Sequence, residues 1–274
     1  MKNKYILILS LLLLVNIACK TTATTNKKDE VKKEISIPDR EHTIQALLWQ
    51  QNAAEYKALC HQAYKIATIE IDQISQRQYK RPIAIVTDID ETVLDNSPYN
   101  ARMVKTDTEY TRETWIAWGK EEKAKAIPGS IVFLNYVKSK GITIYYLSNR
   151  YYSQKLETIN NLKKLGFPQV DETHVLLRKK TSSKKPRREL IEKTHQIIML
   201  LGDNLSDFSE EFESQTTQKR NEIVEEKKSE IGTKFIVFPN PMYGDWETKG
   251  IYEGNYKWTS KQKDSIRKTK FRLN

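Results

Sequence analysis

The feature that most constrains the fold is a set of five short runs rich in branched aliphatic residues. They begin with IAIVT at residue 83 and continue at residues 142–150, 174–178, 195–204 and 234–241. Helical patterns separate them, including GSIVFLNYVKSKG and SQKLETINNLKKLGF. Continuous apolar strands alternating with helices are typical of a parallel sheet covered on both faces. The sequence therefore predicts an α/β fold, and its 274 residues favour one principal domain.

Polar residues follow several of these predicted strands at the point where each strand ends. Ligands of such sheets bind beyond the carboxyl ends of the strands, where the loops converge. We therefore expect the polar residues to lie at one edge of the sheet. They are Asp88 and Asp90 after the first run, Ser148, Asn149 and Arg150 after the second, and Gly202, Asp203, Asn204 and Asp207 after the fourth.

The carboxylates in this group predict a metal ion. Three or four clustered carboxylates stay ionised near neutral pH only when a cation lies among them. Oxygen ligands without His or Cys favour Mg²⁺, and we expect one ion in the site. A calcium EF-hand loop starting at Asp88 is excluded, because it would need Gly and Glu where the chain has Val93 and Tyr99.

The pair Asp88 and Asp90 suggests phosphoryl chemistry. One carboxylate can attack phosphorus and form an aspartyl phosphate, while the other protonates the departing oxygen and later takes a proton from water. An isolated Asp-x-Asp pair is as often structural, for example as a cap. The polar groups at the other strand ends favour the catalytic reading.

These residues also carry a resemblance to a known family. DIDET (88–92) resembles the first motif of the haloacid dehalogenase (HAD) superfamily, Ser148 its second and GDNLSDF (202–208) its fourth. VTDIDETVLDNSPY and IIMLLGDNLSDF are similar to the signatures of class C acid phosphatases, the lipoprotein e(P4) family. The resemblance runs from about Glu41 to the C-terminus and includes LLWQQNAAEYKAL and NPMYGDWE. It implies a HAD-like Rossmannoid sheet flanked by helices.

The resemblance implies roles for the acidic residues. Asp88 would be the nucleophile that accepts the phosphoryl group. Asp90 would be the general acid and base, and it would also offer its backbone carbonyl to Mg²⁺. Asp88, Asp90 and Asp203 are thus the implied metal ligands. Asp207 is expected to support the metal shell or to cap a helix.

Other residues are expected to hold the substrate. By resemblance, Ser148 would bind a phosphate oxygen and a lysine would neutralise charge on the phosphoryl group. SSKKPRR places Lys184 in that position, with the adjacent Lys185 left open. The predicted substrate-binding residues are Thr92, Asn149, Arg150, Trp118 and Tyr243, with Trp115 and Tyr99 as further aromatic candidates for stacking on a nucleotide base.

The N-terminus predicts export and a lipid anchor. Residues 1–18 are typical of a signal peptide, with Lys2 and Lys4 before an apolar stretch. Cys19 after Ala18 resembles the lipobox of bacterial lipoproteins, although Asn16 departs from it. We expect lipidation of Cys19, a flexible tether over 19–40 and a phosphatase domain over 41–274, with residues 41–76 and about 96–127 forming a helical cap.

The sequence therefore predicts an Mg²⁺-dependent acid phosphatase of the bacterial cell envelope, at the outer membrane or cell surface. The expected substrate is a phosphomonoester, with nucleoside 5′-monophosphates first. A broad or non-nucleotide phosphomonoesterase and a non-catalytic, ligand-binding (haem-type) envelope lipoprotein are the alternatives, and a homodimer is left open. The formal charge of +11 does not indicate nucleic-acid binding, because eight Lys or Arg against two Glu lie in one stretch, residues 178–193.

Overall fold

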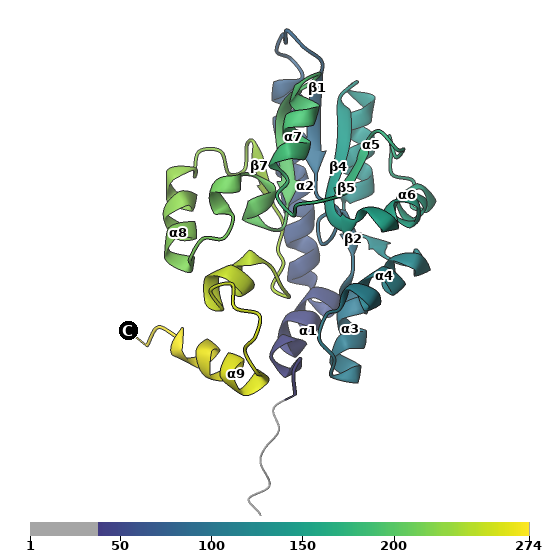
Figure 1. The fold of residues 1–274 in the computed structure, drawn as a ribbon. Coiled ribbons are helices and arrows are strands. Elements are labelled where there is room, and N and C mark those ends of the chain that lie inside the picture. The colour runs from purple at the N-terminus through teal and green to yellow at the C-terminus, as the bar shows by residue number, and fades with distance from the viewer. Residues whose placement is uncertain (1–37, 274) are drawn as a thin grey trace, which may run out of the picture. The chain divides into compact units, whose positions relative to one another are not determined.

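A five-stranded parallel sheet forms the centre of the computed structural model, which describes residues 38–273 (Figure 1). Its order is β5-β4-β1-β6-β7, so the chain starts in the middle and builds outwards on both sides. The strands are β1 (Ile83–Thr87), β4 (Thr143–Tyr151), β5 (Val175–Arg178), β6 (Gln196–Gly202) and β7 (Phe235–Val237). The five predicted strands and the α/β class are therefore confirmed.

Helices cover both faces of the sheet. On one face lie α2 (Ala54–Ile74), α5 (Ser130–Ser139) and α6 (Lys155–Lys164), which pack against residues such as Ile85. On the other face α7 (Lys185–Glu192) packs against Ala84 and Val86. Successive side chains of β1 thus enter opposite cores, as expected for a strand buried on both faces.

A helical region lies beyond the carboxyl end of β1 (Figure 1). It contains α1 (Ile44–Asn52), α3 (Ser97–Thr106), α4 (Arg112–Glu121) and a two-stranded antiparallel ribbon of β2 (Leu94–Asp95) and β3 (Lys125–Ala126). α1 packs against α3. Segments from before and after β1 therefore meet on this side of the sheet.

α2 differs from the expected arrangement, in which all of residues 41–76 belonged to the cap. It runs along the sheet and packs against α5 and β7. The reason is its apolar stripe, since Cys60, Ala67 and Ile71 are fully buried in the main core. Of the N-terminal helices, α1 is the one that packs against the helices following β1.

The C-terminal part of the chain adds short elements before and after β7 in sequence. They are α8 (Thr217–Glu226), a π-helical turn (Trp246–Ile251) and α9 (Ser260–Thr269). In the part of the chain that the structure describes, no helix combines the length and the apolar character needed to cross a membrane. The expected signal peptide, Cys19 and most of the tether lie outside the described residues.

Candidate active site

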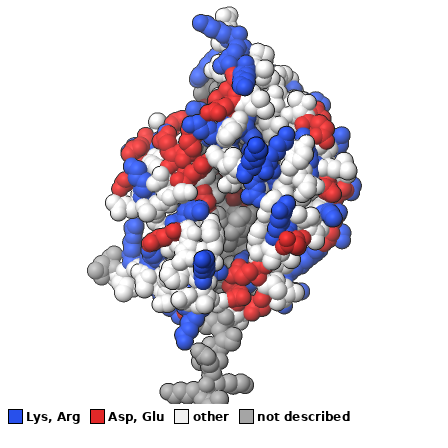
Figure 2. Space-filling model, viewed as in Figure 1, with Lys and Arg blue, Asp and Glu red and all other residues white. Residues whose placement is uncertain are grey.

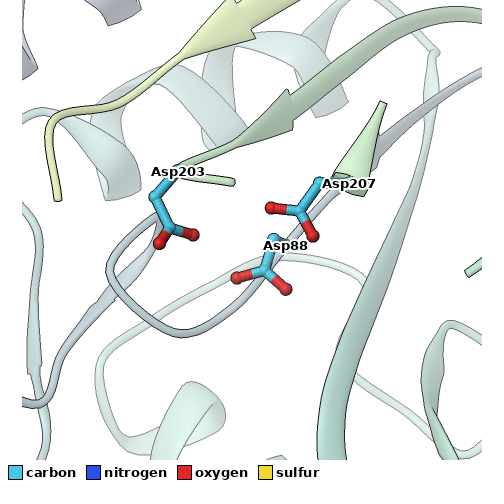
Figure 3. Close-up of side chains that lie close together, drawn as sticks. All are labelled: Asp88, Asp203 and Asp207. Carbon is cyan, nitrogen blue, oxygen red and sulfur yellow. The ribbon is translucent and has the colours of Figure 1, made fainter. Parts of the chain in front are cut away.

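Three aspartates meet at the carboxyl ends of β1 and β6 (Figure 3). β1 and β6 end in register, and the Asp88 backbone N–H donates to the Leu201 carbonyl at 2.8 Å. Asp88 and Asp203 therefore leave adjacent strands side by side. Asp207 joins them from a short 3₁₀ turn (Leu205–Asp207), and one carboxylate oxygen of each residue lies within 4.8 Å of the others.

Lys184 is the cation that reaches this cluster. Its side chain is buried, and Nζ forms ion pairs with Asp88 and with Oδ1 of Asp207, the latter at 2.7 Å. The adjacent Lys185 is exposed and pairs instead with Glu210 at 2.6 Å. The structure thus brings Lys184, and not Lys185, to the aspartates.

The cluster has more negative charge than Lys184 can balance. Burial raises the pKa of Asp88 well above its usual range, the charge of Lys184 opposes this, and Asp207 and Asp203 add to it. Burial likewise raises the pKa of Asp203, with Asp207 adding to the effect. Burial alone would lower the pKa of Lys184, but the charges of Asp207 and Asp88 outweigh it and the pKa is raised. A divalent cation with oxygen ligands fits this set.

Asp90 turns away from the cluster towards two donors on β4 and one just before α3. Its Oδ1 accepts from Asn96 Nδ2 and Arg150 Nε, each at 2.9 Å, and its Oδ2 accepts from the Ser148 hydroxyl at 2.9 Å. The Asp90 carboxylate therefore lies outside the three-aspartate cluster. Its backbone carbonyl remains the group expected to face the ion.

Arg150 holds Asp90 in place. It is 2% exposed, its Nη2 lies 2.8 Å from Asp90 Oδ1, and the same nitrogen donates to Asn96 Oδ1 at 3.2 Å. Its guanidinium also lies 5.5 Å from the ring centre of Trp115. Arg150, which was expected to bind substrate, lines the cleft but uses much of its hydrogen-bonding capacity on Asp90 and Asn96.

Arg187 is a functional candidate that the sequence did not reveal. Its Nη1 donates to the Ser148 carbonyl at 2.6 Å and its Nη2 to Asn149 Oδ1 at 2.7 Å. Burial lowers the pKa of Arg187 to about 10, although the charges of Asp88 and Asp207 oppose the shift. The stretch SSKKPRR looks like a solvated loop, and no local signal distinguishes the arginine that turns inward.

Asp203 is oriented by two donors. Thr92 Oγ1 donates to its Oδ1 at 3.3 Å, and Asn240 Nδ2, just after β7, donates to its Oδ2 at 2.7 Å. Thr92 is fully buried. The predicted substrate-binding residue Thr92 therefore supports an aspartate instead of lining the cleft.

Asp207 takes the capping role that was expected for it, at a 3₁₀ turn, while its support of the metal shell stays a prediction. Its Oδ2 accepts from the Asn204 backbone N–H at 3.1 Å and caps the 3₁₀ turn, while Oδ1 faces Lys184. The absence of a side chain at Gly202 makes room for it, because a Cβ there would lie 2.5 Å from Asp207 Oδ2.

A cleft of about 580 Å³ opens beside Asp90, Asn149 and Arg150. Its aromatic lining consists of Tyr99, Tyr110, Trp115, Tyr243, Tyr252 and Tyr256. On the face drawn in Figure 2, Lys and Arg side chains gather near the middle, between the α8 side and the β4–β5 side of the molecule. The cleft thus joins a polar end at the strand termini to an aromatic region large enough for a small ligand.

Of the two aromatic residues predicted to contact substrate, one lines this cleft. Tyr243 does so, and its hydroxyl donates to the buried carboxylate of Glu91, 152 positions away in sequence. Burial raises the pKa of Glu91 to about 8, with Asp90 adding to the effect. Trp118 is 3% exposed, lies outside the cleft lining and donates from Nε1 to Asn96 Oδ1 at 2.8 Å. Trp115 takes the position at the cleft wall.

Comparison with known proteins identifies the class to which this fold and site belong. The chain belongs to the family described as HAD superfamily, subfamily IIIB (acid phosphatase), which matches residues 7–246. The expected family is therefore confirmed.

The chain is also similar to particular proteins. The class C acid phosphatase from Bacillus anthracis is 42% identical, with a TM-score of 0.83 over 87% of this chain and 100% of that one. A structure of that enzyme with tungstate bound is 43% identical, with the same coverage and TM-score. Two Glycine max proteins are more distant. The Stem 31 kDa glycoprotein is 27% identical over 62% of each chain, and the Stem 28 kDa glycoprotein is 30% identical over 44% of this chain. The chain spans 62% and 51% of the length of these plant relatives.

Proposed function

We propose that this chain hydrolyses phosphomonoesters with one bound Mg²⁺, through an aspartyl phosphate on Asp88. The observation that carries the proposal is the cluster of buried Asp88 with the partly buried Asp203 and Asp207 beside Lys184, with Asp90 held next to it. Asp88 and Asp203 would hold the ion, together with the Asp90 carbonyl and with Asp207 in support. The ion would supply positive charge to the phosphate oxygens.

Three protein residues carry out the proposed chemical steps. Asp88 attacks phosphorus in line with the leaving oxygen, and Lys184 stabilises charge on the phosphoryl oxygens. Asp90 Oδ1 accepts from Asn96 and Arg150, whereas Oδ2 accepts only from the Ser148 hydroxyl among the described residues, so Oδ2 is the oxygen that would carry the proton to the leaving group. Asp90 then takes a proton from the water that attacks the aspartyl phosphate. This returns Asp88 and Asp90 to their starting states and releases phosphate.

We propose nucleoside 5′-monophosphates as the preferred substrates. The cleft places aromatic side chains, including Trp115 and Tyr243, in the same cavity as Asp90 and Arg150. A nucleobase can stack on an aromatic side chain whichever base it is, because every base has a flat aromatic face. The tungstate-bound Bacillus anthracis relative supports an oxyanion site in the same fold.

We further propose that the protein acts in the bacterial cell envelope, held by a lipid on Cys19. The support is the N-terminal sequence alone, with its short apolar stretch followed by Ala18 and Cys19. Residues 19–40 would then separate the lipid from the folded domain.

The test is phosphate release by the chain from residue 19 onward, with Cys19→Ser. Substrates would be nucleoside 5′-monophosphates, sugar phosphates and an aryl phosphate, each with Mg²⁺ or with chelator, at acid and neutral pH. We expect Mg²⁺-dependent turnover that is highest with nucleotides and disappears in Asp88→Asn. Turnover that prefers another ester would overturn the substrate assignment, and no turnover by a folded protein with Mg²⁺ would overturn the activity.

A further inference from the structure

Arg178 is the one cation of the cleft lining, within the described chain, that has no carboxylate partner. Arg150 pairs with Asp90 at 2.8 Å, Arg40 and Lys263 pair with Glu109 at 3.5 and 2.7 Å, and His42 lies 3.3 Å from Glu247. No ion pair among residues 38–273 involves Arg178, which is partly exposed at the end of β5. Its positive charge is therefore available to a ligand.

A second arginine increases the positive charge at this place. The guanidinium groups of Arg178 and Arg112 lie 4.2 and 4.6 Å from the ring centre of Tyr151. Two like charges against one ring repel each other, and in the described residues no carboxylate pairs with either of them. A bound anion would relieve this repulsion, which favours anion binding beside Tyr151.

The position of Arg178 relative to the reacting end follows from the sheet. Arg178 pairs with Tyr151 on the neighbouring strand, after a register shift between Ser148 and Tyr151 that contains Asn149 and Arg150. Arg187 joins the two strands by donating to the Ser148 carbonyl at 2.6 Å and to the Leu176 carbonyl at 3.4 Å. Arg178 and Asn149 therefore lie at one edge, on the same cleft as Asp90.

Asn149 adds a donor at this edge. Its Oδ1 accepts from Arg187 at 2.7 Å, which fixes the amide and leaves the Nδ2 group without an acceptor in the described structure. A guanidinium and an amide donor are a suitable pair for phosphate oxygens.

We propose that Arg178, with Asn149, binds a second anionic group of the substrate, so that the chain accepts nucleoside bisphosphates as well as monophosphates. This inference rests on the proposed function, because it places the reacting phosphate at Asp88 and the second phosphate at Arg178. A phosphate fits better than a carboxylate because its greater charge and three oxygens use both donors.

The experiment compares adenosine 3′,5′-bisphosphate with adenosine 5′-monophosphate in the wild type, Arg178→Gln and Lys179→Gln. Lys179 is the matched control, since it is the next residue, carries the same charge, lies against Tyr152 and does not line the cleft. We expect the ratio of kcat/KM for the bisphosphate to that for the monophosphate to fall roughly tenfold in Arg178→Gln and to change less than about twofold in Lys179→Gln. An unchanged ratio in Arg178→Gln, or an equal fall in Lys179→Gln, would overturn the proposal.

A binding experiment without turnover tests this inference independently of the proposed function. The Asp88→Asn protein would be titrated calorimetrically with both nucleotides in Mg²⁺, with and without Arg178→Gln. The same roughly tenfold loss in relative affinity for the bisphosphate is expected without any turnover. If the wild type hydrolyses no nucleotide but this loss is seen, the proposed function fails and the second anion site stands. If the loss is absent, Arg178 does not bind the second phosphate of the nucleotide, and the proposal fails whatever the activity.

A sugar pair, glucose 1,6-bisphosphate and glucose 6-phosphate, identifies the source of the second phosphate. Dependence on Arg178 with the adenosine pair supports the nucleotide assignment. Dependence with the sugar pair alone would keep the second anion site and overturn the nucleoside bisphosphate as its ligand.

Discussion

Lys184 and Lys185 are neighbours in sequence with opposite surroundings. Lys184 is 3% exposed between Asp88 and Asp207, whereas Lys185 is exposed and pairs with Glu210. A buried charge within a carboxylate cluster acts at close range in a region of low dielectric constant. An exposed ion pair contributes little free energy, because water and salt screen it.

This contrast gives the first prediction. Lys184→Met lowers kcat by about 10²- to 10³-fold, because charge on the phosphoryl group loses a fixed counter-charge. Lys185→Met changes kcat by less than about twofold. Steady-state phosphate release with Mg²⁺ measures both, and circular dichroism checks that each variant is folded. Equal effects of the two substitutions would contradict the assignment of Lys184.

The two tryptophans of α4 give the second prediction. Trp115→Leu raises KM for nucleotides by roughly fivefold or more with little change for an aryl phosphate, because it removes a stacking face from the cleft. Trp118→Phe leaves KM unchanged and lowers the free energy of unfolding by about 1–3 kcal/mol, since Asn96 Oδ1 loses a buried donor. Substrate titrations and urea unfolding measure these effects. If KM rose in Trp118→Phe and not in Trp115→Leu, Trp118 and not Trp115 would be the residue that contacts the substrate.

At the scale of elements, the junction of β6 with its 3₁₀ turn sets the position of Asp207. The turn can fold back against the strand because Gly202 has no side chain, and Asp207 caps the turn through the Asn204 N–H. Gly202 thus allows Asp207, just after the end of β6, to place its carboxylate in the cluster.

The third prediction concerns this junction. In Gly202→Ala the new Cβ would lie 2.6 Å from Asp207 Cβ, so the turn must move away from Asp88. We expect the Mg²⁺ concentration for half-maximal activity to rise by roughly tenfold, and the free energy of unfolding to fall by about 1–3 kcal/mol. An Mg²⁺ titration of activity and a separate unfolding curve measure the two effects. A variant with lower stability and unchanged Mg²⁺ dependence would show that Asp207 does not support the metal site.

The limits of prediction from sequence also lie at this scale. The strands could be predicted because each is a continuous apolar run, and Asp88 and Asp203 because each directly follows such a run. Which of Trp115 and Trp118 lines the cleft could not be predicted, because both lie on α4 and the orientation of α4 depends on its packing against other helices. The contact of Glu91 with Tyr243 could not be predicted either, because the two residues are 152 positions apart in the sequence. Arg187 was missed because its burial is set by the carbonyls of β4 and β5.

At the scale of the whole molecule, the N-terminal segment is proposed to determine where the enzyme acts. Residues 1–18 and Cys19 have the sequence pattern of an exported lipoprotein, and the family match begins at residue 7. One acyl chain gives weak membrane binding, whereas several give stable anchoring.

The fourth prediction tests this anchor. In bacteria that express the full chain, the wild type is recovered with membranes and its N-terminal peptide carries a lipid mass on Cys19. Cys19→Ser is recovered in the soluble fraction with its phosphatase activity retained. Fractionation and intact-mass measurement provide the readouts, and an unmodified Cys19 in the membrane fraction would exclude lipidation as the cause of attachment.

The measurement closest to the central claim asks whether Asp88 becomes phosphorylated. Asp90→Asn would be mixed with Mg²⁺ and an aryl phosphate, whose leaving group needs no proton from Asp90, and then quenched in acid. We predict that the phosphoryl group accumulates on the peptide containing Asp88, because hydrolysis of the aspartyl phosphate lacks its base, and that it is absent when Asp88→Asn is added. A phosphoryl group on another residue, or wild-type turnover in Asp88→Asn, would contradict the account.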